Sequence, residues 1–296
     1  MVVIEPTFGN LWVYFLLQIF GYPFKKTVSV TVNIGGRPDD LQIVNGNDVT
    51  FDEFSKFYNF TVFLADIRKE RSFCTGIILA EQYVQVAAHC VEKKAGSYKN
   101  YRVYVGSNKL RGGKMYQLAQ QYHMKNWKGH VKYGYDTMVL KLAVKIPFDD
   151  ISHPASPVLF AERNDKSEDN CFLIGFGANK NEGRVYPDNY PKLLQKIQMP
   201  LINNKECKDI YGADKIINCM GCAGYEKGGH MANGCGGDSG ASLMCLRNER
   251  WELVGTFSYN GNCQDVDIPQ IITNITYPLV KQFLKKYRKI EFIHEV

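Results

Sequence analysis

The 296-residue sequence predicts an all-β fold, because most of it consists of short strand-like runs separated by turn residues. Apolar residues make up 45% of the chain and charged residues 22%, a composition that supports a globular protein with a sizeable core. Apolar residues recur at three- and four-residue spacing only near the end, which predicts one terminal helix. Its apolar stripe consists of Leu279, Val280, Phe283, Leu284 and Tyr287.

The strand-like runs are rich in β-branched and aromatic residues and are spaced along the whole central part of the chain. Short strands at such intervals are typical of a β-barrel or a β-sandwich, and this pattern alone leaves both open. The clearest runs are residues 60–64, 76–79, 101–105, 137–140, 171–174 and 252–256.

Three segments differ in composition. Residues 1–21 contain the apolar run 11–20, which has the length of an export signal and is too short to span a bilayer. The signal is atypical, because Glu5 and no lysine or arginine precede the run. Residues 22–42 are polar and predict a pro-segment, and residues 43–290 then form the folded domain.

The cysteine content predicts an oxidising compartment. Nine cysteines are many for a cytosolic protein of this size, and the odd number leaves one thiol free or paired between chains. Two triplets that begin at Asn59 and Asn274 have the pattern of N-glycosylation sites. Together with the export signal, these features predict a secreted, extracellular protein.

The net charge of +6 arises partly from lysines and an arginine between residues 281 and 289. A basic strip can bind nucleic acid or an anionic surface, but it is also the ordinary solvated face of a terminal helix. No zinc finger, phosphate loop or RNA-binding aromatic motif accompanies the charge in the sequence. We therefore expect no nucleic acid partner and no membrane association.

The most informative motif is Gly234-Cys-Gly-Gly-Asp-Ser-Gly240, which surrounds Ser239 with glycines. A serine hydroxyl becomes a nucleophile only when a base accepts its proton, and the reaction needs donors for the developing oxyanion. Glycines allow the backbone to fold tightly enough to aim two N–H groups at one point. Taken alone, the motif is also compatible with a simple turn.

Two further segments supply the partners that a nucleophilic serine requires. His89 lies in Val86-Ala-Ala-His-Cys90, and alone it would be equally compatible with a structural histidine or a metal ligand. Asp136 opens the apolar run 137–142, where an aspartate would otherwise serve as a loop or cap residue. A buried carboxylate that holds a histidine tautomer is the third member of a catalytic triad.

Together these segments resemble the chymotrypsin/trypsin family of serine endopeptidases, over residues 43 to about 287. The resemblance implies two six-stranded antiparallel β-barrels followed by a C-terminal α-helix. It makes Ser239 the nucleophile, His89 the general base and then acid, and Asp136 the residue that orients His89. The N–H groups of Gly237 and Ser239 would form the oxyanion hole.

The same resemblance implies a disulfide pattern and an activation site. Ile43 would become a new N-terminus whose ammonium group pairs with Asp238. Cys219 has no partner in this pattern, although an exchange with Cys222 as the partner of Cys207 stays open. The implied pairs are Cys74–Cys90, Cys171–Cys245, Cys207–Cys222 and Cys235–Cys263.

The residues expected in the specificity pocket depart from the family pattern. Ser258-Tyr259-Asn260 matches the segment that pairs with the substrate backbone and forms one wall of the pocket. Asn233 replaces the aspartate of trypsin-like members, so a basic substrate side chain would lack its counter-charge. Asn260 and Gln270 replace common glycines and are expected to narrow the pocket.

The resemblance therefore implies a secreted serine endopeptidase with non-tryptic, narrowed specificity. Its partners would be protein or peptide substrates and protein inhibitors, and the protein would be a monomer without cofactor or metal. Gln42 stands before Ile43 where the family usually has a basic residue, so a trypsin-like activator is not expected. The narrowed pocket and this unusual bond favour the alternative, a catalytically weak or inactive paralogue that acts by binding.

Overall fold

The computed structural model describes residues 4–7, 10–13, 46–69, 73–163, 166–167, 170–178, 190–224, 234–260 and 268–288. The chain divides into two compact units, Met1–Asp40 and Leu41–Val296. In the first unit, strand β1 (Ile4–Thr7) pairs antiparallel with β2 (Asn10–Val13). None of the helices among the described residues is both long enough and apolar enough to cross a membrane.

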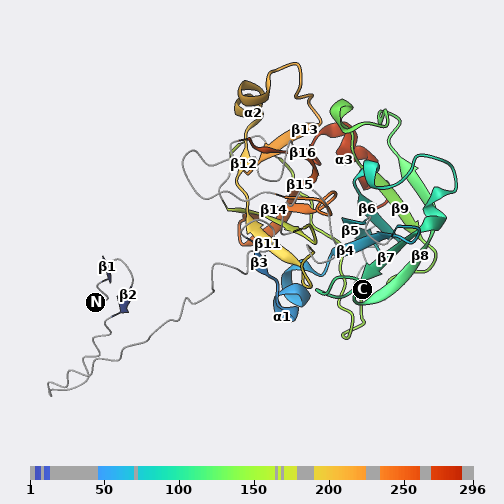
Figure 1. Ribbon diagram of the computed structural model, residues 1–296, viewed down its shortest axis with the longest axis horizontal. Helices are drawn as coiled ribbons and strands as arrows, with labels where there is room; N and C mark the ends of the chain where they lie inside the picture. The colour runs from blue at the N-terminus through green and yellow to red at the C-terminus, as the bar shows by residue number, and fades with distance from the viewer. Residues whose placement is uncertain are drawn as a thin grey trace, which may run out of the picture. The chain divides into compact units, whose positions relative to one another are not determined.

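The first half of the second unit is a closed antiparallel barrel of six strands, ordered β4-β5-β6-β9-β8-β7 (Figure 1). Its strands alternate between buried and partly exposed positions, as in β7, or are buried throughout, as in β4. The bounds are β4 (Thr61–Asp66), β5 (Phe73–Ala80), β6 (Tyr83–Val86), β7 (Tyr101–Val105), β8 (Lys114–His123) and β9 (Met138–Leu142).

The second half is one antiparallel sheet of eight strands, ordered β12-β13-β16-β15-β14-β10-β11-β3. β3 and β12, at its two ends, have only two residues each. The expected second barrel of six strands is therefore an eight-stranded sheet in the structure. The bounds are β3 (Asn47–Asp48), β10 (Cys171–Gly175), β11 (Gln195–Gln198), β12 (Leu201–Ile202), β13 (Met220–Ala223), β14 (Ser242–Arg247), β15 (Arg250–Tyr259) and β16 (Gln270–Asn274).

The predicted terminal helix is α3 (Pro278–Lys285), and it begins with proline in its first turn, where a missing N–H is tolerated. Val280 and Leu284 are fully buried on its apolar side. Beyond the helix, the Tyr287 ring packs on the rings of Tyr83 and Tyr122 in the first barrel.

The structure also contains helices that the apolar spacing did not predict. The short α1 (Phe51–Glu53) continues into a π-helix over Phe54–Tyr58, and α2 (Asn204–Tyr211) precedes β13. Asn203 caps α2 by accepting a hydrogen bond from the backbone N–H of Glu206 at 3.0 Å. Short 3-10 helices cover Ala88–Cys90, Ser97–Asn100 and Val131–Tyr133.

Three disulfides join described residues, one in the first half and two in the second, and their pairing is the one implied by the resemblance. They are Cys74–Cys90, Cys171–Cys245 and Cys207–Cys222. Cys235 is also disulfide-bonded, and its expected partner, Cys263, lies outside the described residues. Cys219 is a buried free thiol, and burial raises its pKa.

Candidate active site

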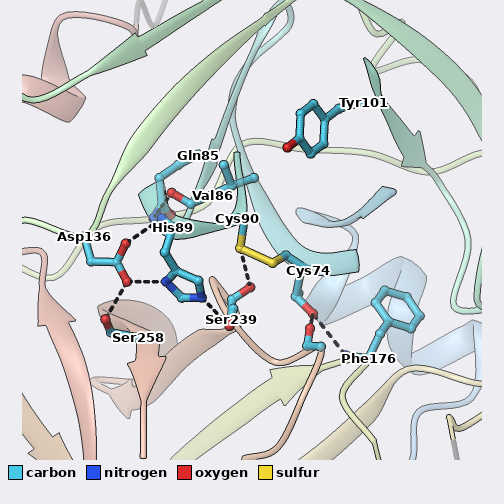
Figure 2. Close-up of a disulfide and its surroundings, with 12 residues drawn as sticks. Cys74, Gln85, Val86, His89, Cys90, Tyr101, Asp136, Phe176, Ser239 and Ser258 are labelled. Atoms are coloured by element: carbon cyan, nitrogen blue, oxygen red, sulfur yellow. Dashed lines mark hydrogen bonds and ion pairs between the residues drawn. A yellow bond between two sulfur atoms is a disulfide. The ribbon is translucent and has the colours of Figure 1, made fainter. Parts of the chain in front are cut away.

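His89, Asp136 and Ser239 meet where the two halves of the fold adjoin (Figure 2). His89 lies in the 3-10 helix that follows β6, and Asp136 lies two residues before β9. Both therefore come from the first barrel. Ser239 belongs to the loop that leads into β14 of the second sheet, so the cluster exists only when both halves are folded together.

The three side chains form a hydrogen-bonded chain. His89 Nδ1 lies 2.7 Å from Asp136 Oδ2, and His89 Nε2 lies 2.8 Å from Ser239 Oγ. The backbone N–H of His89 also donates to Asp136 Oδ1 at 2.9 Å. The Asp136 side chain is 1% exposed and the His89 side chain 31%, so the ring is accessible while the carboxylate is shielded from water.

The Ser258 side chain contacts Asp136, which the family resemblance did not imply. Its hydroxyl donates to Asp136 Oδ2 at 2.5 Å, which makes it a partner of the carboxylate as well as part of the segment assigned to substrate binding. The hydroxyl of Thr273 donates to the backbone carbonyl of Asp136 at 3.2 Å. The second sheet thus holds a residue of the first barrel through two hydroxyl groups.

Thr75, in β5, anchors the loop that carries Ser239. Its N–H donates to the Ser239 carbonyl at 3.0 Å, and its hydroxyl donates to the Gly237 carbonyl at 3.1 Å. Gly240 has a φ of +83°, and a Cβ atom there would lie 2.3 Å from the Thr75 carbonyl oxygen. This close approach explains why glycine follows Ser239.

Gly237 and Ser239 carry the two backbone N–H groups that are expected to form the oxyanion hole. The N–H of Ala178 donates to the Gly236 carbonyl at 2.7 Å, so the Gly237 N–H, on the opposite side of that trans peptide, points away from Ala178. Among the described residues, the N–H groups of Gly237 and Ser239 have no hydrogen-bond acceptor. Both donors are therefore available to an oxygen atom bound next to the serine.

Asp238 is a buried carboxylate directly before Ser239. It accepts hydrogen bonds from the N–H groups of Gly177 at 2.8 Å and Cys235 at 2.9 Å. Burial raises the pKa of Asp238 to about 7, and these two hydrogen bonds offset only part of that effect. None of the described lysine, arginine or histidine side chains forms an ion pair with it, and Ile43 lies outside the described residues.

Two of the residues expected in the specificity pocket, Asn260 and Gln270, lie against Gly234. Asn260 Nδ2 donates to the Gly234 carbonyl at 2.8 Å, which joins the segment after Ser258 to the segment before Ser239. Gln270 is fully buried, and a Cβ atom on Gly234 would lie 2.9 Å from its Oε1. Asn233 lies outside the described residues.

Gln85 was not singled out in the sequence, although it is a polar residue inside the apolar run 84–88. Its side chain is fully buried, and Nε2 lies 3.2 Å from Thr137 Oγ1 and 3.3 Å from Thr256 Oγ1. Gln85 therefore connects the strand before His89 with the residue after Asp136 and with β15. A polar residue in an otherwise apolar strand was the only signal for it.

One group of side chains near the site has the spacing of a metal site. Cys74, His89 and Cys90 offer atoms within 4.8 Å of one another. The two sulfur atoms form a disulfide, however, so they are not thiolate ligands. His89 instead directs both ring nitrogens to Asp136 and Ser239.

A six-stranded barrel beside a second antiparallel sheet, with an Asp–His–Ser chain between them, defines the class of chymotrypsin-like serine proteases. The family model described as Trypsin matches residues 43–281. The chain therefore belongs to the trypsin family of serine endopeptidases.

Two relatives illustrate how far the chain has diverged. Coagulation factor XI of Bos taurus is 31% identical over 209 residues, which are 70% of this chain and 32% of that protein. The chain thus aligns with only about a third of that relative's length. The structure of neuropsin, described as a serine protease expressed in the limbic system of mouse brain, matches with a TM-score of 0.65 and 22% identity, over 82% of this chain and 99% of that one.

Proposed function

We propose that the protein is a secreted serine endopeptidase that cleaves peptide bonds through an acyl-enzyme on Ser239. The observation that carries this proposal is the hydrogen-bonded chain from Asp136 through His89 to Ser239. Ser239 Oγ attacks the substrate carbonyl carbon while its proton passes to His89 Nε2. Asp136 holds the other ring nitrogen as the donor and stabilises the protonated ring.

The two unoccupied amide groups fit the charge that develops in this reaction. As Oγ bonds to carbon, the carbonyl oxygen becomes an oxyanion that accepts from the N–H groups of Gly237 and Ser239. The C–N bond then breaks, and His89 gives its proton to the departing amine. Water attacks the ester with His89 again as the base, and the proton returned to Ser239 Oγ restores the hydroxyl.

The side chains in the pocket favour substrates with small or polar residues before the scissile bond. Asn260 bridges the two pocket walls, and buried Gln270 lies against Gly234. A lysine or arginine would find no aspartate at position 233 to neutralise its charge. A large aromatic ring would have to displace both amide side chains.

Cleavage between Gln42 and Ile43 is the proposed activation step. The buried Asp238 carboxylate lies beside the two amide donors and needs a cation to compensate its charge. The α-ammonium of a free Ile43 would supply that cation and fix the loop around Gly237. Since Gln42 is not basic, the activating enzyme would differ from trypsin in specificity.

Export through residues 1–21 and a pro-segment over residues 22–42 complete this proposal. Three disulfides support an oxidising compartment, because such bonds are reduced in the cytosol. Of the two glycosylation triplets, the one at Asn274 is the poorer acceptor, because Asn274 is only 6% exposed. Asn59 is partly exposed and is the better acceptor.

The same pocket favours one alternative, a paralogue that binds protein ligands with little turnover. The Asn260 side chain, held by its hydrogen bond to the Gly234 carbonyl, is expected to obstruct the entrance that a large substrate side chain would use. A substrate that cannot seat this side chain is poorly positioned for attack, even with an intact nucleophile.

The deciding experiment uses recombinant protein whose N-terminus is Ile43, with its disulfides verified by mass spectrometry. It is treated with a serine-directed phosphonate and, separately, with a mixed peptide library whose cut sites are read. We expect labelling and cleavage that both vanish in Ser239→Ala. Labelling that persists in that variant would refute the assignment of Ser239. Labelling without cleavage would favour the binding paralogue.

A further inference from the structure

A cavity of about 640 Å³ lies next to the candidate active site. Tyr135 and Tyr259 are among its lining residues. Tyr135 directly precedes Asp136, and Tyr259 directly follows Ser258, whose hydroxyl binds the Asp136 carboxylate. A ligand in this cavity would therefore extend from the segment Ser258-Tyr259-Asn260, which the family resemblance assigns to the substrate backbone.

The cavity is lined by cationic and aromatic side chains. Lys128, Lys132 and Lys215 lie in its wall, and Asp214 is its one acidic lining residue among those described. None of the three lysines forms an ion pair within the described part of the chain. The excess of positive charge is thus available to a ligand.

Two of these lysines lie over an aromatic ring. The ammonium nitrogens of Lys132 and Lys128 lie 5.0 Å and 5.6 Å from the centre of the Tyr133 ring, within the range of cation–π attraction. The ring attracts both ammonium groups toward the same part of the cavity without neutralising their charge.

Tyr135 and Tyr259 remain neutral at this surface. Burial raises the pKa of Tyr135 to about 12 and also raises the pKa of Tyr259. Their rings offer apolar area beside the ammonium groups. A chain with carboxylates set along an extended backbone matches this combination better than a small inorganic anion, which would use the charge and leave the rings uncovered.

We propose that Lys128, Lys132 and Lys215 are specificity-determining residues that select peptide substrates with acidic side chains on the amino-terminal side of the scissile bond. This inference rests on the proposed function, because it concerns the substrate of the same site. It adds selection for acidic substrate side chains to the proposed selection for small or polar residues in the specificity pocket.

The cleavage test compares two peptides that differ only in charge, Glu-Glu-Glu-Ala-Ala-Ala and Gln-Gln-Gln-Ala-Ala-Ala, both acetylated and amidated. Surface charge pairs of this kind are individually weak, so we expect kcat/KM to favour the acidic peptide by about fivefold to tenfold at low salt. Lys132→Glu/Lys215→Glu should abolish or reverse this preference, and Asp214→Asn should increase it. Lys285→Glu, an exposed lysine on α3, is the matched control and should leave it unchanged.

The binding test uses Ser239→Ala protein and fluorescein-labelled forms of the same peptides, read by anisotropy. Tighter binding of the acidic peptide that is lost when Lys132→Glu/Lys215→Glu is added would support the inference. This holds even if the active protein cuts neither peptide, because that result would refute only the proposed function. Equal cleavage and equal binding of the two peptides would overturn the inference and leave the proposed function intact. A preference that survives the double lysine change would also overturn it.

Discussion

At the scale of single residues, three donors converge on the Asp136 carboxylate. The His89 backbone, the His89 ring and the Ser258 hydroxyl lie within 2.9 Å of its oxygens. A carboxylate that is 1% exposed has lost its water, so these donors are what make its ionised form tolerable. They also fix its orientation, and with it the orientation of the His89 ring.

Ser258→Ala tests how much one of these donors contributes. The change removes a hydrogen bond to a charged group while two donors remain, so we expect kcat to fall by about tenfold with little change in KM. Steady-state kinetics with any substrate found in the library checks this. Thr273→Val is the control, because its hydroxyl binds the Asp136 backbone and not the carboxylate. Equal losses in both variants would mean that Ser258 acts only through packing.

The three residues of the proposed catalytic triad were predictable from the sequence, whereas the residues that fix their positions were not. Ser239, His89 and Asp136 lie in short motifs whose residue types match a nucleophile, a base and its orienting acid. Thr75 and Gln85 acquire their roles from partners 162 and 171 positions away in the chain. No local pattern encodes contacts of that separation, so only the folded molecule reveals them.

At the scale of secondary structure elements, the β14–β15 hairpin has an unfavourable turn. Only Asn248 and Glu249 separate the two strands, and they have φ values of +48° and +61°. Two-residue hairpins that require positive φ at both positions strongly prefer Asn-Gly. Asparagine suits the first position, but glutamate at the second carries a Cβ atom into a region that favours glycine.

Glu249→Gly should therefore stabilise the protein. We expect the free energy of unfolding to rise by about 1 kcal/mol, because the strain of the left-handed residue disappears. Urea unfolding followed by fluorescence provides the measurement. Glu249→Ala is the control, since it removes the same carboxylate but keeps the Cβ atom, and it should give little gain. A gain of the same size in both variants would assign the effect to charge.

Strands were easier to predict than short helices. The run 101–105 coincides with β7, because its β-branched and aromatic residues are typical of strands. The eight-residue α2 has a single buried residue, Cys207, which is joined to Cys222 of β13. Its position depends on this disulfide and on the Asn203 cap rather than on an apolar stripe, so periodicity did not reveal it.

At the scale of the whole molecule, the candidate site depends on how the two halves of the protease domain meet. Cys74–Cys90 lies within the first barrel, and Cys171–Cys245 and Cys207–Cys222 lie within the second half. Contacts such as Thr75 with Gly237 cross between the halves instead. The geometry around Ser239 is therefore maintained by hydrogen bonds and packing, and a small shift between the halves would separate it from His89.

The buried Asp238 carboxylate makes the stability of the uncleaved chain depend on pH. Its folded pKa of about 7 lies above the ordinary value of 3.8, so the folded state binds more protons between these values. The stabilisation by the protonated Asp238 carboxyl group is complete below pH 3.8 and is lost as the pH rises through about 7. The shift corresponds to roughly 4 kcal/mol of unfolding free energy lost between about pH 4 and pH 7.5.

Cleavage before Ile43 should remove this dependence. An ammonium group paired with Asp238 stabilises the ionised form, so protein that begins at Ile43 should keep its stability over that range. Chemical unfolding at several pH values compares it with protein that retains residues 22–42. In the longer form, Asp238→Asn should abolish the decline, because the amide does not ionise. Identical pH profiles for the cleaved and uncleaved proteins would refute the pairing of Ile43 with Asp238, since a buried carboxylate cannot gain a cation without a change in its proton affinity.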